Sequence, residues 1–400
     1  MGFWLIVLGS VFLGAIACGI YLVTHVMKFR FMRRLRDERG IGRVSVIFIS
    51  LGIILVPVGV LLIALGTMNA VICVIHLALF WIVCDLVAFV VRKLRKTDGE
   101  GAGIRNAQDD AVKSRKPYVA GICAVALCLL YLTCGWILAH QVSAKEYELA
   151  TAKELHDSND SDSSRGLRII QFADAHIGTT FDASGFEKAV RKMAEYRPDI
   201  VVITGDFVDN DTPEEDFVAC CEALGELRAN TQYGIYYVYG NHDKSFVSNM
   251  LNARGGARVA EELKKNGVVV LEDEAVLIDG RFYVIGRQDF SRGEGPGGRA
   301  SIASLTQDLD RSKYMIVLDH QPRDYSLEAA AGVDLVLSGH THGGQMLPLA
   351  PLVGLLGSND LVYGHERRDG TDFIVTSGIS DWAIAFKTGC RSEFVVIDVK

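Results

Sequence analysis

The chain has 400 residues, more than one average domain, and its mean hydropathy of +0.23 is high for a sequence that is 22% charged. Its charge is divided unequally: the residues up to Ser143 contain 15 Lys and Arg against 7 Asp and Glu, and the remainder contains 26 against 41. The two parts therefore belong in different environments. Because the acidic second part has no basic stripe, the sequence argues against nucleic acid as partner or substrate.

Four apolar stretches in the first part are each long enough to cross about 30 Å of hydrocarbon. They cover residues 3–26, 44–65, 70–91 and 118–140. No basic residue precedes the first stretch, so it does not read as a cleaved signal peptide and we expect it to be retained. The sequence thus predicts a transmembrane region with four helices over residues 1–143.

Two basic clusters decide the predicted orientation of these spans. The first follows the first span, and the second separates the third span from the fourth: Lys28, Arg30, Arg33, Arg34, Arg36, Arg39 and Arg43; then Arg92, Lys93, Arg95, Lys96, Arg105, Lys113, Arg115 and Lys116. Loops rich in Lys and Arg lie on the cytoplasmic side of a membrane. We therefore predict a multi-pass protein of the cell membrane whose C-terminal half is extracytoplasmic.

The rest of the chain reads as a linker followed by a folded domain. Residues 144–165 are rich in Ser, Asp, Glu and Lys, as polar linkers are. Over residues 166–400, short β-branched runs alternate with helical patterns, which indicates a layered α/β domain. The expected strands are LRIIQF, DIVVITG, GIYYVYG, YMIVLD, DLVLSG, TDFIVTSG and SEFVVIDV, and the expected helices cover 184–196, 213–229 and 257–266. VVVLEDEAVLI and RFYVIG flank Asp279-Gly280, a favoured two-residue hairpin turn.

Polar side chains follow five of these strands. In chain order they are Asp174 and His176; Asp206 and Asp209; Asn241, His242 and Asp243; His320; and His340 and His342. Ligand sites of open α/β sheets lie beyond the carboxyl ends of the strands, so we expect these groups on one rim. A single histidine of this kind is more often a hydrogen-bonded structural residue. Five together, interleaved with Asp and Asn, indicate a metal site.

The donor types suggest which metals would bind. Carboxylate and neutral imidazole ligands suit Mn, Fe or Zn better than Ca or Mg. A carboxylate shared by two metals roughly 3.5 to 4 Å apart supports in-line displacement at phosphorus, and Asp206 is the natural bridge. Nearby glycines allow close backbone approach, or serve turn geometry alone: Gly205, Gly240, Gly339, Gly343 and Gly344.

Five ordered motifs carry a family resemblance. They read DAH, GDFVD, GNHD, the histidine of VLDHQP, and GHTHGGQ. In this order they resemble the calcineurin-like metallophosphoesterase superfamily, from residue 166 to the C-terminus. The HQP context, the GHTHGGQ extension and the apolar spans resemble its membrane-associated bacterial phosphodiesterase branch. The fold implied by the resemblance is a two-sheet α/β/β/α sandwich.

The resemblance also implies a role for each site residue. Asp174, His176 and His342 would hold one metal, Asn241, His320 and His340 the other, and Asp206 would bridge them. His242 would protonate the leaving oxygen or stabilise the phosphoryl charge, with Asp243 orienting it and Asp209 lying just outside the ligands. The implied nucleophile is a metal-bound hydroxide.

We therefore expect a membrane-anchored dinuclear phosphoesterase with two divalent metal ions, Mn, Fe or Zn. The bond hydrolysed can be a phosphodiester, a phosphomonoester or a pyrophosphate, and candidate substrates include lipids and envelope precursors. The alternative is a non-enzymatic membrane sensor or scaffold, whose expected signature is missing ligands; none is missing. The acidic domain disfavours a nuclease. The sequence leaves the substrate, the native metals and the oligomeric state open.

Overall fold

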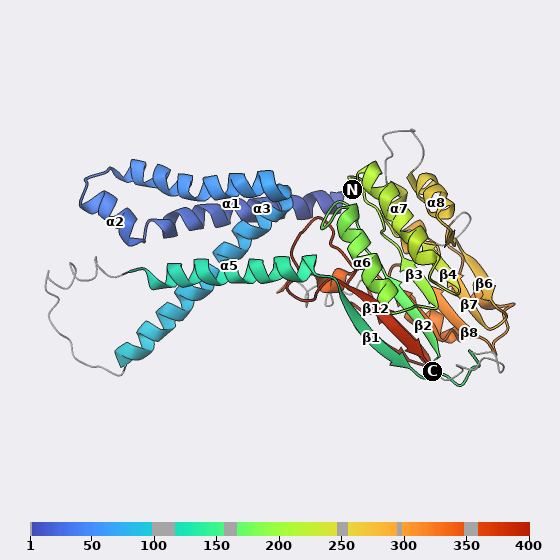
Figure 1. Ribbon diagram of the computed structural model, residues 1–400. Helices are drawn as coiled ribbons and strands as arrows, with labels where there is room; N and C mark the ends of the chain where they lie inside the picture. Colours follow the sequence, from blue (N-terminus) through green and yellow to red (C-terminus); the bar gives the residue numbers. More distant parts are fainter. Residues whose placement is uncertain (1, 98–116, 156–165, 246–254, 294–297, 348–358) are drawn as a thin grey trace. The chain divides into compact units, whose positions relative to one another are not determined.

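The computed structural model describes residues 2–97, 117–155, 166–245, 255–293, 298–347 and 359–400 (Figure 1). It contains two compact units, Met1–Cys134 and Gly135–Lys400. Each unit is described by itself below.

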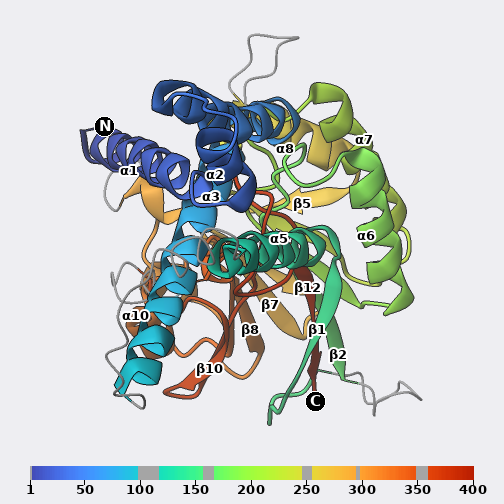
Figure 2. The same cartoon turned by 90° about the vertical axis from the view of Figure 1, so that its left-hand side faces the viewer.

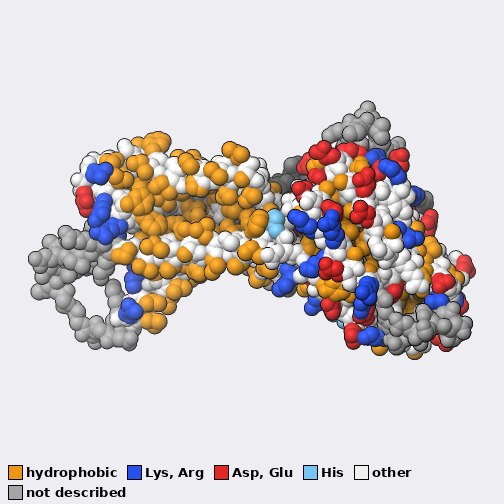
Figure 3. Space-filling model, viewed as in Figure 1, with side chains coloured by type: hydrophobic (Ala, Val, Ile, Leu, Met, Phe, Trp, Pro, Cys, Tyr) orange, Lys and Arg blue, Asp and Glu red, His pale blue; other side chains and the backbone are white. Residues whose placement is uncertain are grey.

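Long apolar helices make up the N-terminal unit. They are α1 (Gly2–Val26), α2 (Arg30–Asp37), α3 (Arg43–Thr97) and the first part of α5 (Val119–His140). Hydrophobic side chains cover much of their surface (Figure 3). Among the described residues, three helices are long and apolar enough to cross a membrane: Gly9–Val26, Arg43–Arg95 and Val119–His140. This finding makes a membrane region plausible and leaves the predicted count of four spans unconfirmed.

The difference in count comes from α3. This helix runs for 55 residues and includes both the second and third predicted spans. Its backbone leaves helical geometry at Gly66, where φ is 80° and ψ is 172°. Glycine adopts such a conformation without the steric penalty of a side chain, so Gly66 forms a kink that divides α3 into two helical parts.

Two six-stranded mixed sheets form the centre of the C-terminal unit. The first, sheet A, has the order β1-β12-β2-β3-β4-β5, and the second, sheet B, has the order β10-β11-β9-β8-β7-β6. The strands of sheet A are β1 (Ser143–Leu149), β12 (Glu393–Val399), β2 (Leu167–Phe172), β3 (Ile200–Thr204), β4 (Gly234–Val238) and β5 (Val268–Val270). Those of sheet B are β10 (Gly364–Arg368), β11 (Thr371–Val375), β9 (Leu335–Ser338), β8 (Tyr314–Leu318), β7 (Phe282–Gly286) and β6 (Glu274–Ile278).

Alternating side chains along these strands build three hydrophobic layers. In β3, Val201 and Ile203 pack with the helices on one face of sheet A, whereas Ile200 and Val202 pack against sheet B. The helices on sheet A are α6 (Ala183–Glu195), α7 (Glu214–Arg228) and α8 (Gly255–Lys265), seen along one side of the domain in Figure 2. Short helices α9 (Ile302–Thr306) and α10 (Tyr325–Ala330) cover the outer face of sheet B. The predicted α/β domain with two sheets is confirmed.

The predicted hairpin is present, and its first run is shorter than expected. β6 and β7 pair antiparallel with Ile278 opposite Phe282, so three residues connect them, Asp279, Gly280 and Arg281, and not the two that we expected. Asp279 and Gly280 both have positive φ angles, 50° and 69°. The VVV segment, which we expected to continue into β6, instead forms β5 in the other sheet. A left-handed Asp273 (φ 57°) lies between them, so the chain turns from one sheet to the other.

Part of the expected polar linker is a strand. β1 pairs in parallel with β12 along its whole length. Because Lys145, Glu146 and Glu148 are charged, the sequence of β1 does not show the apolar pattern of a strand. Such charges are usual on an edge strand, where they oppose pairing with a strand of another molecule. Residues 156–165 of the expected linker lie outside the described residues.

Candidate metal centre

The carboxyl ends of strands from both sheets meet at one rim. The backbone N–H of Asp174, after β2, donates to the carbonyl of Gly205, after β3, at 3.0 Å. His320, after β8, has its Nδ1 2.8 Å from the carbonyl oxygen of Thr204. The N–H of His340, after β9, donates to the Asp174 carboxylate at 3.0 Å. Hydrogen bonds thus join the strand-end loops of the two sheets.

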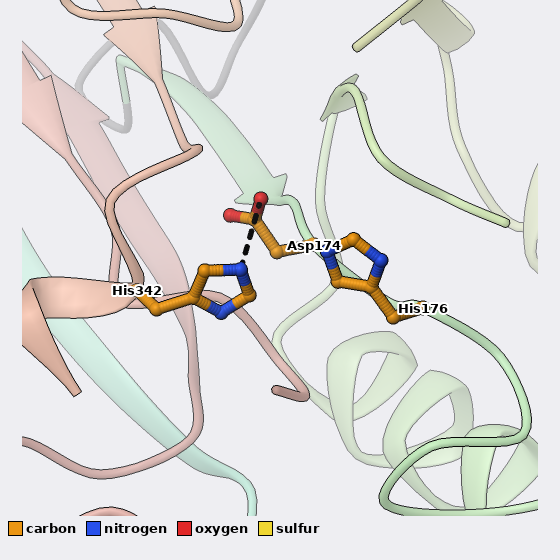
Figure 4. Close-up of side chains that lie close together, drawn as sticks. All are labelled: Asp174, His176 and His342. Atoms are coloured by element: carbon orange, nitrogen blue, oxygen red, sulfur yellow. Dashed lines mark ion pairs between the residues drawn. The ribbon is translucent and has the colours of Figure 1, made fainter. Parts of the chain in front are cut away.

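One cluster of candidate ligands consists of Asp174, His176 and His342 (Figure 4). Each offers a ligand atom, and these atoms lie within 4.8 Å of one another. His342 Nε2 is 3.9 Å from Asp174 Oδ1, and the two imidazole rings stack with their centroids 5.3 Å apart. All three side chains are buried. The structure brings together three residues that are separated by up to 168 positions in the sequence.

A second cluster consists of Asp206, His320 and His340, whose candidate ligand atoms also lie within 4.8 Å of one another. His320 Nε2 is 3.1 Å from Asp206 Oδ2 and 3.2 Å from Asn241 Oδ1. The His320 and His340 rings have centroids 5.1 Å apart. Asn241 therefore lies beside this cluster.

Asp206 belongs to the second cluster and also lies close to His176 of the first. Its Oδ2 is 3.1 Å from His320 Nε2 and 3.7 Å from His176 Nε2. Its Oδ1 accepts a hydrogen bond of 2.9 Å from the backbone N–H of His242. One oxygen of this carboxylate therefore faces both groups of imidazoles, the position a shared ligand needs.

The surroundings of His242 differ from the expected ones. His242 Nδ1 lies 3.1 Å from Asp209 Oδ1, and Asp209 Oδ2 lies 3.5 Å from His176 Nδ1. We expected Asp243 to orient His242. Instead, the Asp243 carboxylate accepts four backbone hydrogen bonds, from the N–H groups of Asp206, Phe207, Val208 and Gly240. Asp243 therefore holds the loop that carries Asp206, and Asp209 is the carboxylate at the His242 ring.

Backbone conformation marks the same residues. Five candidate ligands have left-handed backbones: Asp174 (φ 54°), His176 (35°), Asp206 (53°), His340 (72°) and His342 (49°). Such conformations are uncommon for residues other than glycine and cost about 1–3 kcal/mol each. They persist only where the surrounding structure enforces them, and they concentrate at functional sites.

Glycines pack directly against the candidate ligands. A Cβ atom on Gly240 would lie 2.1 Å from Asp206 Oδ1, and one on Gly339 would lie 2.6 Å from Asp174 Oδ2. At these two positions the expected close backbone approach is present. Gly378, which the sequence analysis did not single out, also packs against Asp174: a Cβ atom on Gly378 would lie 2.8 Å from the Cβ atom of Asp174.

Burial and neighbouring charges set the protonation of the site. Burial, helped by His320, lowers the pKa of His340 to about 4, and burial with His176 lowers that of His342 well below its usual value. Burial alone would raise the pKa of Asp206, but His320 and His176 hold it well below its usual range. Neutral His340 and His342 and an ionised Asp206 are in the forms that bind metals. At His320, burial lowers the pKa, but the carboxylates of Asp206 and Asp174 raise it well above its usual value, so this ring must give up its proton to bind a metal.

The donor set and its unsatisfied atoms fit divalent cations. Both ring nitrogens of His176 and Nδ1 of His342 are buried without a hydrogen-bond partner among the described residues. Leaving a buried polar atom unsatisfied costs about 1–3 kcal/mol. Lone pairs of imidazoles and carboxylates gathered within ligand distance are instead what a metal ion such as Mn, Fe or Zn requires.

Two groups near the rim were missed in the sequence. Asp289 follows β7, and its carboxylate accepts hydrogen bonds of 3.0 and 3.1 Å from Nε2 of Gln321, the residue after His320. The strand-end rule that found the other carboxylates would have found it too. Gln171 lies inside β2 and donates to Thr204 Oγ1 and the Ser338 carbonyl, which ties β2 to both sheets; no sequence motif marks it.

Comparison with known proteins agrees with this geometry. The family model for the calcineurin-like phosphoesterase matches residues 167–344. An uncharacterized metallophosphoesterase of Aquifex aeolicus is 35% identical over 237 residues, which cover 58% of this chain and 85% of that one. The chain belongs to the calcineurin-like metallophosphoesterase family. Family membership and the clustered ligands identify the C-terminal unit as a metal-dependent phosphoester hydrolase domain.

Other metallophosphoesterases are similar over a smaller share of their length. One of Campylobacter jejuni is 30% identical over 237 residues, 59% of this chain and 60% of that protein. A zebrafish (Danio rerio) transmembrane protein with a metallophosphoesterase domain is 28% identical over 249 residues, 60% of this chain and 54% of that protein. The chain thus spans about three fifths of the Campylobacter relative and about half of the zebrafish one.

Proposed function

We propose that this metallophosphoesterase hydrolyses a phosphate ester with two divalent cations, and that Asp206 binds both. Asp174, His176 and His342 hold one cation, and Asn241, His320 and His340 hold the other. The observation that carries the proposal is the position of Asp206 Oδ2, 3.1 Å from His320 and 3.7 Å from His176. A carboxylate shared in this way is the central element of a two-metal site.

The chain's own groups divide the remaining tasks. When bound, the two cations supply Lewis acidity toward the phosphoryl oxygens and lower the pKa of water. His242 is partly exposed, and its Nδ1 lies beside Asp209 Oδ1. It protonates the leaving oxygen or stabilises the phosphoryl charge, and Asp209 fixes its ring. Asp243 maintains the loop of Asp206 through its four backbone contacts.

The proposal is tested with the full-length protein in detergent. Loaded with Mn²⁺, it should hydrolyse at least one class in a panel of phosphodiesters, phosphomonoesters, pyrophosphates and envelope lipids. A chelator should abolish the turnover, and Mn²⁺, Fe²⁺ or Zn²⁺ should restore it. If the metal-loaded protein binds two cations but hydrolyses no member of the panel, the non-enzymatic sensor or scaffold becomes the better account.

We further propose that the N-terminal helices are a four-span anchor. At 1.5 Å per residue the 55 residues of α3 extend to roughly 80 Å, more than twice a hydrocarbon core of about 30 Å. The break at Gly66 supports two spans within α3. The transmembrane relative of zebrafish also supports membrane association. A membrane-resident substrate, such as a lipid or an envelope precursor, is compatible with such an anchor.

The predicted orientation has a direct test. The two basic loops should lie in the cytoplasm, which places the C-terminal unit outside it. Reporter fusions at residue 101 and at the C-terminus should therefore report opposite compartments. A cytoplasmic C-terminal reporter would show that the positive-inside argument fails for this chain.

A further inference from the structure

An exposed indole stands beside the candidate proton donor. Trp382 is 45% exposed, and its ring centroid lies 5.4 Å from that of His242, with the two planes inclined at 52°. Exposing a large apolar ring to water is unfavourable, and residues before and after it in the chain, Asp381 and Ala385, are buried. The loop therefore directs this one ring outward at the edge of the metal centre.

A strained turn displays this ring. The N–H of Ile384 donates to the carbonyl of Trp382 at 2.6 Å, and the residue between them, Ala383, has a φ of 59°. A hydrogen bond from residue i+2 to residue i around a left-handed central residue is typical of a classic γ-turn, which is rare and strained. Alanine lacks the freedom of glycine in this region, so the surroundings must enforce the turn.

The turn is fixed on both sides. After it, the Ile384 carbonyl accepts a 2.8 Å hydrogen bond from Gln345 Nε2, and Gln345 is itself hydrogen-bonded to the His342 carbonyl. Before it, the Asp381 N–H donates to Thr180 Oγ1 at 3.2 Å. The anchors thus connect the turn to the loops that carry His342 and His176.

A buried lysine reinforces the anchor at Asp381. Lys387 is fully buried and lies 3.4 Å from the Asp381 carboxylate. Its Nζ donates to the carbonyls of Ser377, Gly378 and Ser380, three residues of the segment that precedes Trp382. A buried charge is tolerated only when it is paired and hydrogen-bonded, and here the bonds hold the base of the turn.

We propose that Trp382 is a binding face for a planar ring, such as an aryl group or a nucleobase, carried by the part of the substrate that contains the leaving oxygen. The inference rests on the proposed function, because His242 defines the leaving-group side. A rigid indole presents a flat apolar surface on which such a ring stacks in offset or edge-to-face geometry. Trp382 is thus a specificity-determining residue next to the metals rather than part of the catalytic machinery.

The test measures binding of two small phosphates to the full-length, Mn²⁺-loaded protein by calorimetry. Phenyl phosphate carries a ring, and methyl phosphate does not. Trp382→Ala should lower the affinity for phenyl phosphate by roughly 5- to 100-fold, the usual effect of removing a stacking aromatic residue. The affinity for methyl phosphate should change by no more than about twofold. Trp382→Phe, which keeps an aromatic face, should lose less.

Leu327→Ala is a matched control, because Leu327 is an exposed apolar residue of α10 outside the metal clusters. It should change neither affinity. Equal weakening of both phosphates by Trp382→Ala would show that the indole only supports His242 by packing and would overturn the ring site. Unchanged phenyl phosphate affinity would overturn it as well. If Trp382→Ala gives either of these results and the wild-type protein still hydrolyses its substrate, only the ring site is contradicted. If the wild-type protein binds neither phosphate, both the ring site and the proposed function are contradicted.

Discussion

Replacing Asp206 by Asn should release metal from the site and nearly abolish turnover. The substitution removes the negative charge that faces His320 and His176 at 3.1 and 3.7 Å, so both cations lose a ligand at once. Metal ions contribute several kcal/mol to such reactions, so turnover should fall by roughly a thousandfold or more. Metal analysis after dialysis, together with steady-state rates, measures both effects.

Asp209→Asn is the matched control for this variant. Asp209 is also an aspartate of the GDFVD motif, but its oxygens lie against the His242 and His176 rings and not between the clusters. Loss of such a supporting carboxylate typically costs about 10- to 100-fold in metal affinity or activity. An asparagine at 206 still offers Oδ1 to the His242 N–H, so the loop should keep its shape. Equal metal stoichiometry in the two variants would remove Asp206 from the bridging role.

The site residues at the strand ends could be predicted from the sequence. Asp174, Asp206 and His320 were found because buried β-branched runs precede them, and the two sheets do bring their side chains together. The pattern works because hydrophobic runs determine strands and because the carboxyl ends of parallel strands form a common rim. It predicts which groups meet, without the distances between them.

The strand pattern does not predict the contacts that loop residues make. The family resemblance implied that Asp243 orients His242, but the Asp243 carboxylate accepts hydrogen bonds from backbone N–H groups, and Asp209 is the carboxylate beside the His242 ring. Trp382 and Lys387 belong to a segment with no strand or helix periodicity, and only the folded loop reveals their positions. In the same way, β1 was hidden because edge strands are polar.

His242→Ala should separate catalysis from metal binding. The ring of His242 is partly exposed and contacts Asp209, whereas its backbone N–H, which alanine retains, makes the contact with Asp206. Both metals should therefore stay bound. General acid catalysis typically contributes about 100- to 10,000-fold, so turnover of a substrate with a poor leaving group should fall within that range. Metal analysis and rates with an alkyl phosphate ester measure the two quantities.

The sharper measurement is the contrast between two leaving groups. A p-nitrophenyl ester, whose leaving group needs little protonation, should lose much less activity in His242→Ala than the alkyl ester, since the missing proton matters only where the leaving oxygen is basic. His365→Ala is a control, because His365 also pairs with a carboxylate, Asp372 at 2.8 Å, but lies on β10 outside the metal clusters; both rates should remain unchanged. If His242→Ala slows the two esters alike while both metals stay bound, His242 stabilises charge on the phosphoryl group instead of donating a proton. If it strips the metals, the ring is itself a ligand. His176, Asp209 and His242, whose candidate ligand atoms also lie within 4.8 Å of one another, would then have to be counted as part of the metal site.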